Sequence, residues 1–216
     1  MLIYNKLIKK FIYHIHIPRT GGRFIRSIFE NNKNYLTFFA SYKNFYKNIE
    51  IPHLTYPHYL DLDKFFINYD NLNKPKIASI EHFTVVRNPF DKFKSEMKCF
   101  LKSEKELSDL INLNKNELEN LINKNIQITT NNWSVPQSLF ISPQTKIWKF
   151  ENRFNVEFVK WIKEQFGFDI IDINVKYKED SYDTNKLNLN SLEKIKPFIE
   201  EIYEKDYDRF GYQKDT

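Results

Sequence analysis

The sequence predicts a single α/β domain with a central parallel sheet flanked by helices, and two stretches carry that prediction. An apolar and aromatic run at 11–17 is bounded by Pro18 and followed by a Gly-Gly turn and a helical pattern. A second apolar run at 77–86 leads into a helical pattern at Pro89 in the same way. Strands that are apolar on both faces and alternate with helices are typical of covered parallel sheets. The 216 residues suffice for one such domain, 1–216.

The first strand-to-helix junction carries the residues of an anion site. Gly21 and Gly22 allow a tight turn and a close approach of the backbone to a ligand. The first N–H groups of a helix have no partner inside it, so phosphate or sulfate binds there readily. Three neighbouring side chains add charge or a hydroxyl: Arg19, Thr20 and Arg23. The alternative is a strand-to-helix turn with two glycines for steric reasons only.

The segment after the first helix predicts a second strand and a loop with two histidines. A short aromatic run at 35–40 is expected to form the strand. Pro52 and Pro57 favour extended or turn conformations at His53 and His58. A histidine on a loop can accept the proton of a substrate hydroxyl near neutral pH. Both are candidates for a general base, and a solvated or turn-capping histidine is the alternative.

The second junction begins a helix that is apolar on one side. Pro89 suits the first helical position, where its missing N–H has no partner in any case. Arg87 lies at the carboxyl end of a strand, where open α/β sheets bind ligands, and Ser95 follows two helical turns later. Such an arginine and serine can converge on one phosphate. The expected buried stripe of the helix is Phe90, Phe93, Met97, Phe100 and Leu101.

The rest of the chain predicts further helices and one more strand. Capping-box patterns predict one or two polar helices in a surface insertion at about 103–130. A strand is expected at 145–150, and an amphipathic helix at 155–166 with Gly167 as its C-terminal cap. The last helix is expected to begin near Asn190.

Composition restricts the function classes. The net charge of +5 and the pI near 9.0 favour an anionic ligand, but no nucleic-acid-binding motif is present, so nucleic acid is not expected as a partner. Cys99 is the only cysteine, which excludes internal disulfides and multi-cysteine metal sites. His14 and His16 lack an evident third ligand, so no metal is expected. No apolar run is long enough to span a membrane and the opening residues do not match a signal peptide, which predicts a cytoplasmic protein.

Both junctions resemble the phosphate-binding loops of sulfotransferases that use 3'-phosphoadenosine 5'-phosphosulfate (PAPS), in particular the carbohydrate sulfotransferases of the heparan and chondroitin type (sulfotransferase 2-like). Residues 17–22, IPRTGG, are similar to the IPKTGG of their 5'-phosphosulfate loop. Arg23-Phe24 replaces the usual Thr-Ser, so hydroxyl contacts are lost and an arginine is expected to substitute. Residues 87–95, RNPFDKFKS, resemble the 3'-phosphate signature RDP-x-x-R-x-x-S, with Lys92 at the second arginine.

Weaker similarities extend over nearly the whole chain. Residues 53–56, HLTY, resemble a His-x-Thr segment that lies between the first helix and the next major strand of the family. Gln137 belongs to a Pro-Gln pair that resembles one on the acceptor side. Residues 149–152, KFEN, resemble an R-F-E-N segment, and 203–212 resemble a terminal Y-x-x-D-x-x-x-F-G-Y.

The resemblance implies a P-loop-like fold and an enzyme that moves a sulfuryl group from PAPS to a hydroxyl acceptor, a carbohydrate, without a metal. Arg19 is expected to stabilise charge on the leaving phosphate, and His53 to deprotonate the acceptor for in-line attack, with His58 as the alternative base. His58 and Gln137 are expected to contact the acceptor. The residues expected to hold PAPS are Arg19, Thr20, Gly21, Gly22, Arg23, Arg87 and Ser95.

Two other functions stay open. A nucleotide or small-molecule kinase could share the architecture, although Arg23-Phe24 stands where a Walker A loop has Lys-Ser/Thr. A non-catalytic protein could hold a polyanion or a sugar with the same basic residues, and the departures from the family pattern at Arg19, Arg23 and Phe24 are compatible with that.

Overall fold

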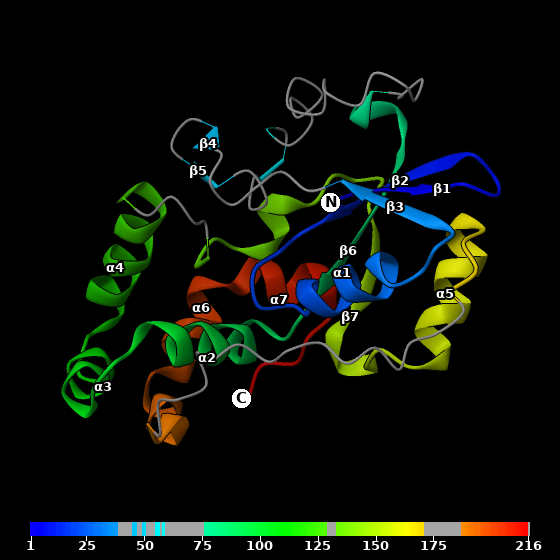
Figure 1. Cartoon of the computed structure of the whole chain (residues 1–216). Helices are drawn as coiled ribbons and strands as arrows, with labels where there is room; N and C mark the ends of the chain where they lie inside the picture. The colour runs from blue at the N-terminus through cyan, green and yellow to red at the C-terminus, as the bar shows by residue number, and fades with distance from the viewer. Residues whose placement is uncertain are drawn as a thin grey trace.

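The computed structural model contains a five-stranded mixed sheet with helices on both faces and a further group of helices beside it (Figure 1). The strand order is β3-β1-β2-β6-β7. The strands are β1 (Leu2–Asn5), β2 (Lys10–Ile15), β3 (Tyr35–Phe38), β6 (Glu81–Val86) and β7 (Lys146–Lys149). The structure describes residues 1–38, 45–46, 49–50, 55–56, 58, 76–128, 133–170 and 187–215.

The pairing of the strands is parallel in one half of the sheet and antiparallel in the other. β6 pairs in parallel with both β2 and β7, as the sequence predicts. β1 lies between β2 and β3 and is antiparallel to both. The four other strands therefore run in one direction, and the expectation of a parallel sheet is correct for them but not for β1. This strand is followed by an Asx-type turn, in which the side chain of Asn5 accepts from Leu7 N at 2.9 Å.

The helices lie close to the positions that the sequence predicts. The segment 77–86 divides into a short 3₁₀ turn, η3 (Ile77–Ser79), and β6. Other short elements are a two-stranded ribbon of β4 (Phe45–Tyr46) and β5 (Ile49–Glu50), and the 3₁₀ turns η4 (Gln137–Phe140), η5 (Phe150–Asn152) and η7 (Leu189–Ile195). The α-helices are α1 (Gly22–Glu30), α2 (Pro89–Phe100), α3 (Glu104–Ile111), α4 (Lys115–Ile128), α5 (Val156–Phe166), α6 (Lys196–Ile202) and α7 (Glu204–Phe210).

Apolar side chains cover both faces of the sheet, which explains why its central strands are apolar throughout. On β2, Tyr13 and Ile15 belong to one buried cluster with Phe210, whereas Ile12 belongs to a second cluster with residues of α1 and α5 such as Phe29. Alternate residues of a strand point to opposite faces, so each face has its own core.

The predicted insertion contributes to a third core. Asn114 and Glu117 form a reciprocal capping box at the start of α4, with bonds of 3.0 and 2.9 Å. Leu107 of α3 and Leu118 of α4 are buried together with residues of α2, η7, α6 and α7, such as Phe93. The two helices are therefore polar on one side only, and they pack into the domain on the other.

Candidate functional site

Two strand-to-helix junctions lie side by side because β2 and β6 are parallel neighbours. Arg19 follows β2, and Arg87 follows β6. The Nη1 atom of Arg87 donates to the carbonyl of Arg19 at 3.4 Å. The Nε atom of Arg19 donates to Oγ of Ser95, two turns into α2, at 3.0 Å. Three of the residues predicted to bind phosphate, which are up to 76 positions apart in the sequence, are thus in contact.

The two arginines form a cationic cluster that is partly shielded from water. The guanidinium of Arg87 lies 4.6 Å from the centre of the Phe150 ring, and that of Arg19 lies 6.0 Å from the Trp133 ring. Burial lowers the pKa of Arg87, and Arg19 lowers it further, whereas Asp91 and Glu151 raise it. Among the described residues, neither arginine forms an ion pair with a carboxylate. The cluster is therefore suited to bind an anion.

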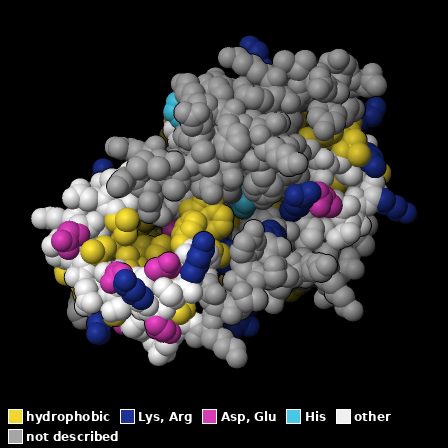
Figure 2. All heavy atoms as spheres, turned by 60° about the vertical axis from the view of Figure 1, so that its left-hand side comes forward, with side chains coloured by type: hydrophobic (Ala, Val, Ile, Leu, Met, Phe, Trp, Pro, Cys, Tyr) yellow, Lys and Arg dark blue, Asp and Glu magenta, His cyan; other side chains and the backbone are white. Residues whose placement is uncertain are grey.

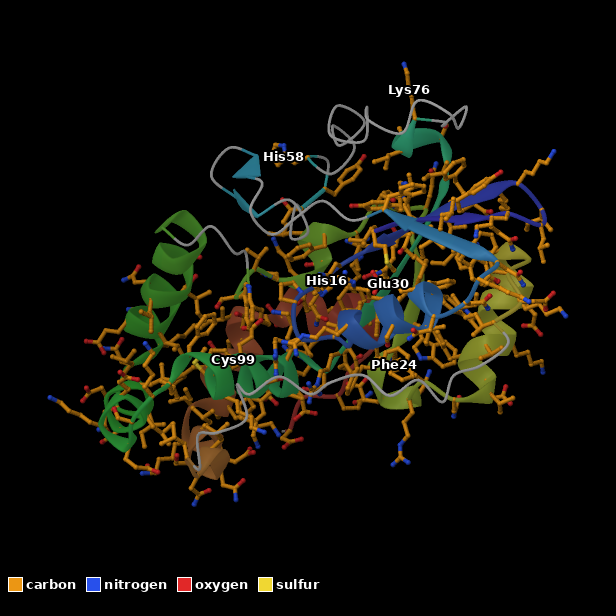
Figure 3. The ribbon with its side chains drawn as sticks, viewed as in Figure 1. His16, Phe24, Glu30, His58, Lys76 and Cys99 are labelled. Atoms are coloured by element: carbon orange, nitrogen blue, oxygen red, sulfur yellow. The ribbon has the colours of Figure 1, made fainter. Side chains whose placement is uncertain are left out.

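Neighbouring side chains leave no room for a Cβ atom at Gly21 or Gly22. Gly21, the N-cap of α1, has a φ of 89°, and a Cβ atom there would lie 2.6 Å from the ring of Phe154. A Cβ atom on Gly22 would lie 2.1 Å from Cδ2 of His16. Figure 3 shows His16 at the chain segment that leads from β2 into α1. The steric explanation therefore accounts for both glycines, whether or not an anion approaches the backbone.

The other predicted residues of this loop differ in their surroundings. Thr20 is fully buried, and its hydroxyl donates to the carbonyl of Ile17 at 2.9 Å, so it closes the loop instead of facing outward. Arg23 is exposed on the first turn of α1. Arg19 has a φ of 64°, an unusual value for a residue with a side chain. Such backbone strain is found most often where a residue is held for a function.

A buried ion pair lies next to Ser95 on α2. Lys92 and Glu96 are 3% and 0% exposed and contact one another, and Lys92 also donates to the carbonyl of Trp133. Lys92 thus pairs with Glu96 and does not join the arginine cluster, although it stands at the second arginine of the family signature. Burial raises the pKa of Glu96 to about 7, while Lys92, Arg19 and Arg87 lower it. Glu96 therefore titrates near neutral pH.

Gln137 is buried and bonded to the backbone of Arg87. Its Oε1 accepts from Arg87 N at 2.9 Å, its Nε2 donates to Arg87 O at 2.7 Å, and it is 0% exposed. This placement does not support the expectation that Gln137 contacts an acceptor, because the side chain has no exposed surface. Sequence patterns could not reveal the contact, since it joins residues 50 positions apart.

Of the two histidines predicted as candidates for the general base, the structure describes one. His53 lies outside the described residues. His58 is described and partly exposed, and Figure 3 shows it near β4 and β5, apart from His16.

One exposed aromatic side chain, Phe100, is connected to the cationic cluster through Trp133. Figure 2 shows hydrophobic side chains gathered beside Lys and Arg side chains on the face turned forward. In α2, Phe100 is 43% exposed, so the predicted stripe is correct for its other four residues but not for this one. Its ring lies 5.1 Å from that of Trp133, which in turn contacts Arg19. The position of Trp133 had no signal in the sequence.

The described residues contain no group of three or more His, Cys, Asp or Glu side chains that could hold a metal ion. In the same part of the chain, no helix is long and apolar enough to cross a membrane. The chain matches none of the known family models, curated proteins or solved structures with which it was compared.

We expect Gly22→Ala to lower the free energy of unfolding by about 1–3 kcal/mol, because the new methyl group would overlap the ring of His16. Urea unfolding of the single variant, of His16→Ala and of the double variant measures this. In the His16→Ala background the cost of Gly22→Ala should largely disappear. An equal cost in both backgrounds would mean that a different contact excludes a side chain at position 22.

The raised pKa of Glu96 predicts a pH-dependent stability. Between pH 4.5 and about 7 the folded state holds a proton on Glu96 that the unfolded state releases, so the contribution of Glu96 to the free energy of unfolding falls as the pH rises through this range. The full contribution is on the order of 3 kcal/mol. Burial lowers the pKa of the Met1 amino group, of His14 and of His82, and these groups make the protein more stable as the pH rises. Urea unfolding at pH 5 and pH 8 should therefore show a change in the free energy of unfolding that is less favourable in the wild type and in Glu164→Gln, an exposed control, than in Glu96→Gln. The same change in Glu96→Gln as in the wild type would assign the whole dependence to other groups.

Proposed function

We propose that the protein is a PAPS-dependent sulfotransferase that transfers a sulfuryl group to a hydroxyl of a carbohydrate, and that its sheet and first loop form a P-loop-like domain. The observation that carries the proposal is the contact of Arg19 with both Ser95 and Arg87. Arg19 belongs to the loop that resembles a 5'-phosphosulfate site, and the two others to the segment that resembles a 3'-phosphate site. Two segments that hold the two ends of one nucleotide must lie next to each other, and residues of these two segments are in contact.

The charge of the cluster supports the same proposal. PAPS carries anionic groups at its 5' and 3' ends, and two guanidinium forks without a carboxylate partner among the described residues offer donors of suitable geometry. Burial lowers the pKa of Arg87, which means that its charged form is poorly solvated. A bound phosphate would replace the lost solvation.

The proposed chemistry assigns a separate task to each residue. PAPS supplies the sulfuryl group: the acceptor oxygen bonds to sulfur, and the bond from sulfur to the 5'-phosphate oxygen breaks with its electron pair remaining on the phosphate. Arg19 stabilises the charge that develops on that phosphate. His53 accepts the proton of the acceptor hydroxyl, and His58 is the alternative base. Arg87 and Ser95 hold the 3'-phosphate.

Nucleotide binding tests the proposal first. We expect 3'-phosphoadenosine 5'-phosphate (PAP), the product nucleotide, to bind the wild type at least about tenfold more tightly than AMP or ATP, because only PAP carries the 3'-phosphate that Arg87 would bind. Isothermal titration calorimetry measures the three affinities. Arg87→Ala should lose the preference for PAP. The matched control is Arg26→Ala, since Arg26 pairs with Glu30 at 2.8 Å on α1 and should not affect binding. Equal or absent binding of the three nucleotides in the wild type would refute the proposal.

Transfer measurements test the role of His53. We expect His53→Ala to keep the PAP affinity of the wild type and to lose roughly 10²- to 10⁴-fold in rate, since a general base acts on the chemical step. Radiolabelled PAPS with a series of carbohydrate acceptors provides the assay, and His58→Ala is measured beside it because His58 is the alternative base. A larger loss of rate in His58→Ala than in His53→Ala would mean that His58 is the general base and His53 is not. Tight PAP binding without transfer to any acceptor would favour the non-catalytic alternative.

A further inference from the structure

The peptide groups of Arg87 are held by a side chain. β6 ends at Val86, and at Arg87 the amide of Gln137 takes the place of a neighbouring strand. It accepts from the N–H and donates to the carbonyl of the same residue, as paired residues of a sheet do. Because the two bonds need opposite ends of the amide, the orientation of Gln137 is fixed. The backbone at Arg87 is therefore held although it lies beyond Val86, the last paired residue of β6.

Asp206 of α7 holds Gln137 in turn. Its Oδ2 accepts from Gln137 N at 2.6 Å, and its Oδ1 accepts from Ser138 N at 2.8 Å. Asp206 is 1% exposed, so these hydrogen bonds take the place of water around its carboxylate. Arg209, one turn further along α7, donates to the carbonyl of Ser138 at 2.9 Å. The start of η4 is thus attached to the last helix by three bonds.

A second route joins the C-terminal segment to the same junction. The hydroxyl of Tyr212 donates to Oε2 of Glu151 at 2.8 Å, and Oε1 of Glu151 accepts from Asn88 N at 2.7 Å. Each of the two residues at the junction, Arg87 and Asn88, is thereby connected to residues 206–212 through one intermediate residue. The segment that resembles a terminal family motif therefore contacts the arginine site indirectly, at two neighbouring peptides.

We propose that Asp206, acting through Gln137, and Tyr212, acting through Glu151, are positioning residues for the anion bound by Arg87. An arginine side chain is long and flexible, so an unsupported one loses conformational entropy when it binds a phosphate. A fixed backbone at its base removes part of that loss. Gln137 and Asp206 have almost no exposed surface, so they act through Arg87 and not on a ligand. The identity of the anion rests on the proposed function, whereas the contacts that hold Arg87 do not.

A double-mutant cycle with PAP and AMP as probes tests the proposal. Gln137→Met keeps the size of the side chain and removes both bonds to Arg87, and Tyr212→Phe removes a single hydroxyl on the second route. We expect the preference for PAP over AMP to fall by about tenfold or more in Gln137→Met and by less in Tyr212→Phe. In the Arg87→Ala background, Gln137→Met should cause no further loss, because it acts only through Arg87. The matched control, Gln144→Met, changes an exposed glutamine and should keep the full preference.

A second readout does not depend on the nucleotide. The Nε–H resonance of Arg87, assigned by its absence in Arg87→Ala, should be sharp and distinct in the wild type. It should shift and broaden in both Gln137→Met and Tyr212→Phe, which circular dichroism should show to be folded. An unchanged resonance in both variants overturns the positioning role whatever the protein binds, as does an equal loss of PAP affinity with and without Arg87. Absent PAP binding in the wild type, together with a changed resonance, refutes the proposed function alone.

Discussion

The parallel pairing of β2 with β6 is the constraint on which the candidate site depends. Ile15 lies opposite Thr84, and the Thr84 hydroxyl donates to the carbonyl of Ile15 at 2.8 Å, close to the point where β2 ends. The two strands therefore deliver their following loops at the same edge of the sheet. Without that register Arg19 and Arg87 would not be in contact. The cores on the two faces hold the register, because a shift by one residue would reverse every side chain.

The structure separates its shielded charges into a buried ion pair and a partly buried cluster of two arginines that has no direct ion pair among the described residues. Lys92 and Glu96 pair with each other inside α2, whereas Arg19 and Arg87 face aromatic rings and backbone or hydroxyl oxygens. Burial and the neighbouring Arg19 lower the pKa of Arg87 despite Asp91 and Glu151, so the charged cluster costs stability in the absence of a ligand. Such a cost is typical of binding sites, where residues are arranged for the ligand and not for the free fold. This contrast between neighbouring groups is the reason for proposing the arginine cluster as the binding site.

Local sequence patterns predicted the helices and most strands, whereas the surroundings of individual side chains depend on contacts between residues far apart in the sequence. The junction at Pro89, the cap at Gly167 and the capping box at Asn114 follow from residues adjacent in sequence, and all three are present. The antiparallel β1 was not predicted, because four residues carry too little periodicity to identify a strand. The contact of Gly22 with His16 and the burial of Gln137 depend on residues brought together only by folding. The sequence thus placed both arginines at strand-to-helix junctions, where the structure has them, and could not identify what holds them.

The bonds from Gln137 go to the peptide of residue 87 and not to its guanidinium. Any residue other than proline presents the same N–H and carbonyl groups, so the support does not depend on the side chain that it supports. The bonds that hold the backbone at residue 87 are therefore independent of the side chain at that position. A related chain could therefore exchange the arginine for another side chain, and so change the ligand it selects, while the surrounding scaffold remains as it is.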